Sequence, residues 1–113
     1  MALKKEIELD NGVIVNYHRI VSLNKITNIG NIIEIASYVS KKKRDEEENY
    51  QNIQKKNIKN EELTEEEKGI LDKGINVFIQ TEYINKEYSE NENIKEAYEY
   101  LKTLEKYEKA ENV

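Results

Sequence analysis

The sequence predicts an α+β domain in which a small antiparallel sheet, made of an N-terminal hairpin and two further strands, is packed by a C-terminal helix. Apolar and polar residues alternate over residues 3–40 and again over residues 75–84, which is the period of a half-buried strand. From Ile94 onward the apolar residues recur at helical spacing instead. Residues 41–73 separate these two parts as a long polar, partly helical insertion.

A chain of 113 residues has room for one hydrophobic core, so we expect residues 1–113 to form a single domain. Charged residues make up 36% of the chain and hydrophobic residues 37%, which indicates a small core that a partner surface would complete. The formal net charge is −5, and the basic run at 41–44 is followed at once by acidic residues. Nucleic acid and anionic membranes select clustered Lys and Arg, so neither is an expected partner.

The sequence contains no cysteine, which excludes disulfides and thiolate metal sites from this chain. Its first residues lack the apolar run of a signal peptide, and nowhere do 18 uncharged apolar residues occur together. These features predict a soluble protein that is made in the cytoplasm.

The first hairpin is predicted from the Asp-Asn-Gly turn signal at residues 10–12. A two-residue loop would mix apolar and acidic side chains on one face of the hairpin. A three-residue loop with a left-handed glycine would instead collect the apolar residues on one face, pairing Ile7 with Val15 and Lys5 with Tyr17. Because a one-residue slip moves every side chain to the other face, we predict the three-residue register.

The later strands show apolar residues on more than one face. We expect the buried face of the second strand to continue through Val21 and Leu23, and we expect some cover over the opposite face, which carries His18 and Ile20. Residues 32–40 are apolar on both faces, as is typical of a central strand. In residues 75–84 we expect the buried face to be formed by Ile75, Val77, Ile79, Thr81 and Tyr83.

Two capping signals predict where two helices begin. Thr64 with Glu67 forms a capping box for a short helix that Gly69 or Gly74 would end. The polar insertion that contains this helix has three interpretations: a mobile insertion, a helical excursion or a binding arm. Ser89 with Glu92 forms a second box, before an apolar stripe that should dock on the sheet. The stripe consists of Ile94, Ala97, Tyr98, Leu101 and Leu104.

The residues that catalysis requires are scarce, and we predict that the protein is not an enzyme. His18 is the only histidine, and no nucleophile elbow, phosphate loop or histidine metal motif occurs. We therefore assign no catalytic, cofactor-binding or metal-binding residues, and we expect His18→Ala to be tolerated. Tyr100 and Tyr107 fall on one flank of the helix, either as boundary residues or as contacts to another subunit. The candidate interface residues are Tyr98, Tyr100, Tyr107, His18 and Arg19.

Three stretches of the chain carry a resemblance to a known group of proteins. They are LKKEIELDNGVIVNYHRI at 3–20, NIIEIASY at 31–38 and AYEYLK at 97–102. Together they resemble a family of small proteins encoded in the tail and baseplate region of phages and prophages of low-GC Gram-positive bacteria. Most members of that family have no assigned activity. The resemblance implies a phage origin and a role in the virion or its assembly, and it transfers no catalytic residue.

Two functional hypotheses follow from this resemblance. The first is a structural or assembly protein of a phage tail or baseplate, which contacts itself or neighbouring tail proteins and forms a homo-oligomer. Such a protein would be present in the host cytoplasm during synthesis and then in the virion. The second is a phage-encoded inhibitor that binds a host defence protein or its signalling ligand. Detection in purified virions would separate the two.

Overall fold

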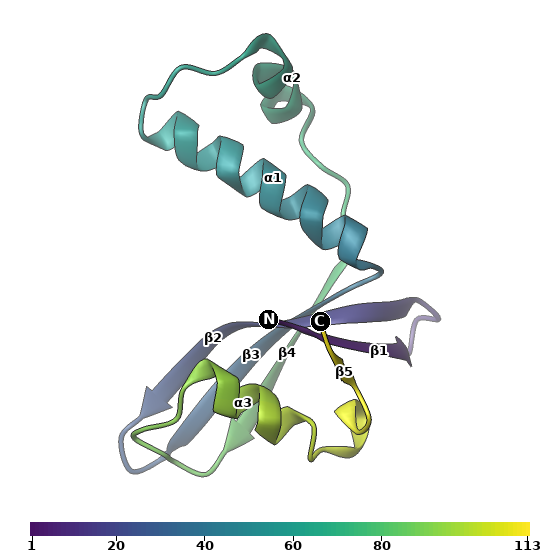
Figure 1. The fold of residues 1–113 in the computed structure, drawn as a ribbon, viewed down its shortest axis with the longest axis vertical. Coiled ribbons are helices and arrows are strands. Elements are labelled where there is room, and N and C mark those ends of the chain that lie inside the picture. The colour runs from purple at the N-terminus through teal and green to yellow at the C-terminus, as the bar shows by residue number, and fades with distance from the viewer.

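The computed structural model describes residues 1–113 and has an α+β fold, as the sequence predicts (Figure 1). Its single antiparallel sheet has the strand order β4-β3-β2-β1-β5. The strands are β1 (Leu3–Glu8), β2 (Ile14–Ile26), β3 (Gly30–Tyr38), β4 (Ile79–Lys86) and β5 (Glu111–Asn112). The helices are α1 (Lys41–Ile58), α2 (Glu65–Lys73) and α3 (Ile94–Leu101), followed by a 3₁₀ turn at Glu105–Tyr107. The sequence predicts four of these strands and misses the two-residue β5.

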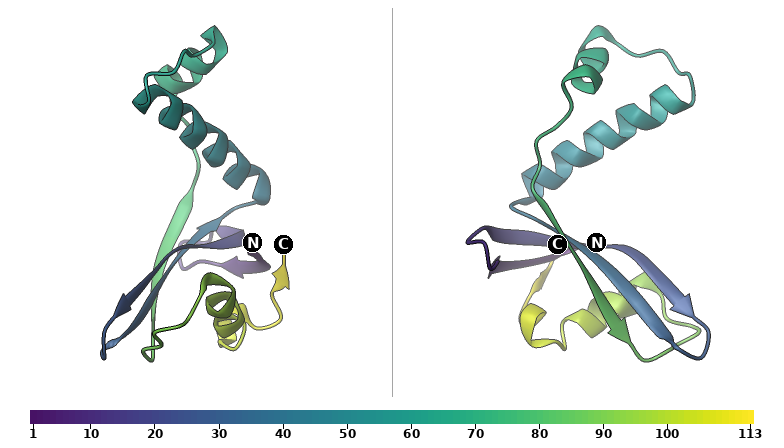
Figure 2. Two further views of the ribbon diagram at one scale, coloured as in Figure 1. Left: turned by 60° about the vertical axis from the view of Figure 1, so that its left-hand side comes forward. Right: turned by 180° about the vertical axis from the view of Figure 1, so that it is seen from behind.

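The helices form two groups, and α1 and α2 lie in the chain between the end of β3 and the start of β4. Helix α3 and the C-terminal segment cover one face of the sheet, whereas α1 and α2 project away from it as an arm (Figures 1 and 2). The molecule measures 47 × 35 × 23 Å along its principal axes. The two termini are adjacent, because Ala2 and Val113 exchange backbone hydrogen bonds of 3.0 and 2.9 Å. No helix combines the length and the apolar character needed to cross a membrane.

The hydrophobic core lies between the sheet and α3. Leu101 is fully buried in it, and the backbone N–H of Ile20 donates a 2.8 Å hydrogen bond to the Tyr98 hydroxyl. That hydroxyl in turn donates to the carbonyl of Met1 at 2.9 Å, which joins the helix to the N-terminus. The predicted docking of the helix is therefore confirmed for Ala97, Tyr98 and Leu101, whereas the predicted burial of Ile94 is wrong, because it is 43% exposed, and Leu104 packs against the core from beyond the end of the helix. The core consists of Leu3, Ile20, Ile33, Ile35, Ala97, Tyr98, Leu101, Tyr107 and Ala110.

The predicted hairpin register is confirmed next to the turn. Leu9 donates to the carbonyl of Val13 at 2.8 Å, Gly12 has φ +86°, and Ile7 lies opposite Val15. Farther from the turn, a β-bulge between Lys4 and Ile7 shifts the pairing by one residue.

The bulge overturns one predicted pair, because Tyr17 lies opposite Lys4 and not opposite Lys5. The extra residue in β1 turns the fully buried Leu3 toward the core, where it lies opposite His18. The carbonyl of Lys5, within the bulge, is bound by the His18 side chain at 2.7 Å.

The buried face of β2 differs from the prediction. A second bulge, between Ile20 and Ser22, leaves Val21 44% exposed, so its predicted burial is wrong. His18 and Ile20, which were assigned to the opposite face, are buried. The cover that the sequence requires for their face is supplied by α3 and the C-terminal segment.

Strand β4 corrects a further prediction. It begins at Ile79 and not at Ile75, and the face that carries Ile79, Thr81 and Tyr83 is exposed. The opposite face is the covered one, because Ile84 lies opposite the buried Ile33 and packs against the core under α3. Strand β3 has β2 on one side and β4 on the other, so its predicted central position is confirmed.

The polar insertion forms two helices, which is the second of its three interpretations. Helix α2 has the predicted capping box: Glu67 N–H donates to the Thr64 hydroxyl, and Thr64 N–H donates to the Glu67 carboxylate, both at 3.1 Å. The helix ends at Gly74, which has φ +73°. Helix α1 begins after Ser40, whose hydroxyl accepts a bond from the N–H of Lys43. Its role as a binding arm stays a prediction.

The predicted cap of α3 is wrong by one turn. Asn93 caps the helix, since its side-chain oxygen accepts a 2.8 Å bond from the N–H of Glu96. Glu92 is instead buried beside the sheet, where it accepts a 2.9 Å bond from Asn31 and forms a 2.9 Å ion pair with Lys86. Both Ser and Asn are favourable caps, and the buried contacts of Glu92 select the later one.

Candidate interaction site

The structure buries three of the five side chains that the sequence proposes for an interface. His18 is 1% exposed, Tyr98 is 3% exposed and Tyr107 is fully buried, so none of them offers a contact surface in this fold. Arg19 and Tyr100 are partly exposed. Within the proposed set, only these two are accessible, and their role in an interface stays a prediction.

His18 lies at the centre of a buried polar network. Its Nε2 contacts the carbonyl of Lys5 at 2.7 Å, and its Nδ1 contacts the Ser37 hydroxyl at 2.7 Å. Because a carbonyl only accepts, Nε2 carries the proton and Nδ1 accepts from the Ser37 hydroxyl. The ring also meets Tyr107 edge to face, with centroids 5.4 Å apart. Burial lowers the pKa of His18 from its ordinary value, which keeps the imidazole neutral.

The same network continues to the sheet edge through Tyr107. The Tyr107 hydroxyl donates to the Glu82 carboxylate at 3.1 Å, and burial together with this carboxylate raises the pKa of Tyr107. Lys106 also donates to Glu82. Neither His18 nor Ser37 lines any of the surface pockets. These contacts therefore tie the C-terminal turn to the sheet and are not placed to meet a substrate.

A second polar cluster anchors the arm to the sheet. The Tyr38 hydroxyl donates to the Glu47 carboxylate at 2.6 Å and accepts from Arg19 Nε at 3.0 Å. Arg44 donates to the same carboxylate at 2.8 Å. Burial raises the pKa of Tyr38, and so does its bond to Glu47. Both arginines of the chain are thus held by one carboxylate on α1.

Glu47→Ala is expected to loosen the arm, because it leaves Arg44, Arg19 and the Tyr38 hydroxyl without their shared acceptor. Removing one partner of a buried charged hydrogen bond costs roughly 1–3 kcal/mol. Amide hydrogen exchange should therefore accelerate in α1, with little change in β2 and β3. Glu48→Ala is the matched control, since Glu48 is an exposed neighbour on the same helix. Equal exchange rates in α1 of the two variants would contradict the anchoring role.

The two edges of the sheet differ in length and protection. On one side the edge is β5, which has only two residues. The other edge is β4, which has eight residues, contains no proline and pairs with β3 without a bulge. We call residues 75–86 the edge segment. It carries four exposed large hydrophobic side chains: Ile75 (39%), Phe78 (38%), Ile79 (36%) and Tyr83 (65%).

Sequence reasoning misses this surface. It finds the alternation in residues 75–84 and reads the apolar face as buried. Alternation identifies a face but does not say what covers it, and α3 covers the opposite face. The signal available in the sequence is the polar composition of residues 41–73, which leaves the insertion helices without an apolar face to cover Ile79 and Tyr83.

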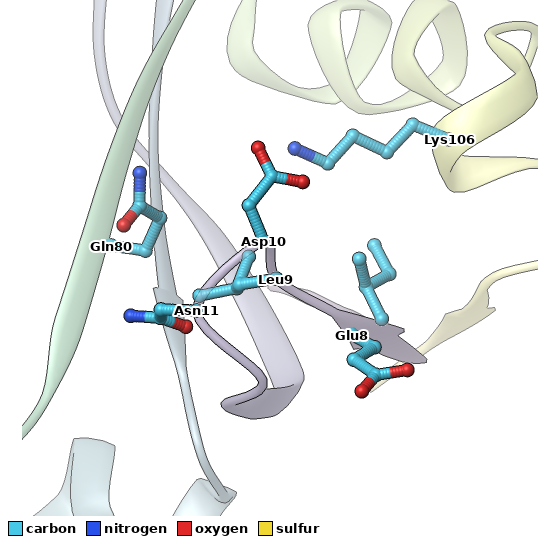
Figure 3. A pocket seen from close by; sticks show the side chains of 7 residues that line it. Glu8, Leu9, Asp10, Asn11, Gln80 and Lys106 are labelled. Carbon is cyan, nitrogen blue, oxygen red and sulfur yellow. The ribbon is translucent and has the colours of Figure 1, made fainter.

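The largest surface recess lies between the hairpin tip and the C-terminal turn. It has a volume of about 410 Å³ and is lined by Ile7, Glu8, Leu9, Asp10, Asn11, Gln80 and Lys106. Lys106 extends toward the Asp10 carboxylate (Figure 3). The chain contains no group of three or more His, Asp or Glu side chains placed to hold a metal ion. The only buried polar side-chain atom without a partner is Asn31 Oδ1, which does not line this recess.

Comparison with protein-family models, curated proteins and solved structures finds no match to this chain. The resemblance to phage tail-region proteins therefore stays a prediction. The two surfaces of the structure that bear on function are the edge segment and the arm.

Proposed function

We propose that this chain is a non-enzymatic structural or assembly protein of a phage tail or baseplate, acting through protein–protein contacts. The phage context comes from the resemblance of residues 3–20, 31–38 and 97–102. The mode of action is supported by one observation above all, the long edge strand β4 with its exposed apolar side chains. An edge of this kind is a template for pairing with another chain. The partners are copies of the same chain, neighbouring tail proteins or both.

The size of the core supports a role in assembly. Only 19 of 113 residues are buried, and the arm adds just Glu47 and Ile53 to them. A small core gives little stability by itself, whereas a partner that binds only the folded state adds stability by mass action. The exposed hydrophobic side chains of the edge segment would be covered by such a partner.

The alternative is a phage-encoded inhibitor that binds a host defence protein or its signalling ligand. The projecting arm supports the protein-binding form, because α1 and α2 present an extended polar surface away from the sheet. Capture of an anionic ligand is less well supported. Arg19 and Arg44 are the only arginines, and both bind Glu47 within the molecule.

The experiment is mass spectrometry of virions purified from the phage or prophage that encodes the chain. An assembly protein of the particle is expected at a constant copy number relative to the major tail protein. Absence from virions, combined with recovery from infected-cell lysate in complex with a host protein, would favour the inhibitor and overturn the proposal.

A further inference from the structure

Strand β4 lacks most of the devices that normally prevent sheet edges from pairing. Such devices are a short strand, a proline, a bulge, and charged side chains, including ones that point inward. Strand β4 has eight residues without proline or bulge, and the side chains on its open face are Ile79, Thr81, Tyr83 and Asn85, none of which is charged. The edge at the other end of the sheet, β5, is kept to two residues. The protein thus protects one edge and leaves the other open.

The charges of β4 are neutralised within the molecule. Glu82 and Lys86 are its only charged residues, and both lie on the face that α3 covers. Glu82 accepts from Lys106 and Tyr107, while Lys86 forms a 2.9 Å ion pair with Glu92. The edge therefore has no net charge, although the whole chain has a formal charge of −5. The Glu34 carboxylate on β3 lies beside Tyr83 on the open face, where it accepts from the Tyr83 hydroxyl at 3.2 Å. The residues of β4 themselves bring no net like-charge repulsion to a second copy of this acidic chain.

We propose that β4 pairs antiparallel with β4 of a second copy about a two-fold axis, so that one sheet of ten strands, five from each copy, spans the dimer. This inference rests on the proposed function and names one partner for it. The two-fold axis is perpendicular to the sheet, so the open faces of both copies lie on the same side. The open-face side chains of both copies, Tyr83 and Asn85 among them, then lie on one face of the joined sheet.

Charge complementarity selects the register of this pairing. When the axis passes beside Ile84, Glu82 of each copy lies opposite Lys86 of the partner, and Tyr83 lies opposite Asn85. Opposite charges on directly facing residues stabilise an antiparallel pair, and like charges destabilise it. This register therefore places opposite charges together on the covered face and uncharged side chains together on the open face.

The geometry also limits the assembly to a closed pair. A filament would require β4 of one copy to pair with the opposite edge of the next, but that edge consists of the two-residue β5 and the short remainder of β1, which a bulge interrupts. Each copy has one long edge, and the two-fold pairing uses both of them.

The oligomeric state tests the inference directly. Light scattering of the full chain over a range of concentrations should show a dimer that dissociates on dilution. Tyr83→Lys should weaken the dimer by about tenfold or more, because it places a charge among the open-face side chains of the pairing strands. Tyr83 is 65% exposed, so this variant should keep the fold, as judged by circular dichroism. Ile29→Lys is the matched control, since Ile29 is 79% exposed but lies in the β2–β3 turn.

Engineered cysteines test the pairing of the strands, because the natural chain has none and any disulfide must join two copies. An equal mixture of Tyr83→Cys and Asn85→Cys chains should form a disulfide-linked dimer on mild oxidation. The control mixture replaces Asn85→Cys with Asn24→Cys, an exposed position on the same sheet face but on β2.

A monomer at every concentration, or cross-linking no greater than in the control mixture, would overturn the inference. Either result would leave the proposed function standing if the protein is found in virions, because a different tail protein would then be the partner of β4. A dimer together with absence from virions would instead overturn the proposed function and keep the pairing of β4.

Discussion

Leu101→Asp is expected to abolish the cooperatively folded state. Leu101 is fully buried between α3 and the sheet, in the same cluster as Ile33 and Ile35. A carboxylate at this position would have no charged partner, and burying it costs several kcal/mol. The free energy of unfolding of a small domain is about 5–15 kcal/mol, so this loss is a large share of it. Thermal unfolding followed by circular dichroism should show no sharp transition.

Ile94→Asp is the control for this substitution. Ile94 lies on the same helix but is 43% exposed in the first turn, where a negative charge interacts favourably with the helix dipole. It should therefore retain a transition close to that of the natural protein. Leu101→Ala should fall between the two, with a loss of about 2–5 kcal/mol. A cooperative transition for Leu101→Asp would contradict the packing of α3.

The local elements of this fold are predictable because short-range chemistry decides them. The left-handed Gly12 defines the hairpin loop, and the reciprocal bonds of Thr64 and Glu67 start α2. Each signal involves residues only a few positions apart, so it can be identified from the sequence alone. The stripe of Ala97, Tyr98 and Leu101 likewise predicts the buried face of α3.

The register beyond the turn is not predictable in this way, since tertiary packing decides it. The bulges in β1 and β2 each insert one residue: the first turns Leu3 toward the core, and the second lies at the exposed Val21. His18 and Ile20 precede the second bulge and are buried because α3 and the C-terminal segment cover their face. Regular alternation, which is the basis of the sequence prediction, cannot reveal a single inserted residue.

The burial of Tyr107, one of the candidate interface residues, has a related reason. The spacing of seven residues places Tyr100 and Tyr107 on one edge of a helix only if that helix continues past both. Helix α3 ends at Leu101, and the following 3₁₀ turn carries Tyr107 back into the core. Tyr83, which lies on the open face, was instead assigned to a buried face. The sequence predicts the strands and the docked helix, but it does not predict which face of the sheet that helix covers.

His18→Ala is expected to destabilise the protein, contrary to the tolerance that the sequence predicts. The substitution leaves the Lys5 carbonyl and the Ser37 hydroxyl without their buried partner and removes the edge-to-face contact with Tyr107. Unpaired buried polar groups cost about 1–3 kcal/mol each, so we expect a total loss of roughly 2–4 kcal/mol. Chemical denaturation at pH 7.5 measures this loss as a shift of the midpoint.

The natural protein should also lose stability as the pH falls below the ordinary pKa of histidine. The stability of His18→Ala should not show this dependence on pH. Burial is the main cause that lowers the folded-state pKa of His18 below 6.5, and the Lys5 carbonyl and Glu82 oppose it only in part. At a pH above 6.5 the imidazole is neutral in both the folded and the unfolded state, and its full contribution to stability is present. As the pH falls from 6.5 through the lower folded-state pKa, the unfolded chain takes up the proton first and stability decreases.

Denaturation midpoints measured between pH 7.5 and 5 would show this decrease in the natural protein and a flatter profile in His18→Ala. Glu67 does not interfere in this range, because its bond to Lys56 lowers its pKa from the ordinary 4.5. Parallel profiles for the two proteins would mean that His18 takes up its proton equally well in both states. Such a result would contradict the buried, neutral imidazole that joins β2 to the bulge in β1 and to Ser37 on β3.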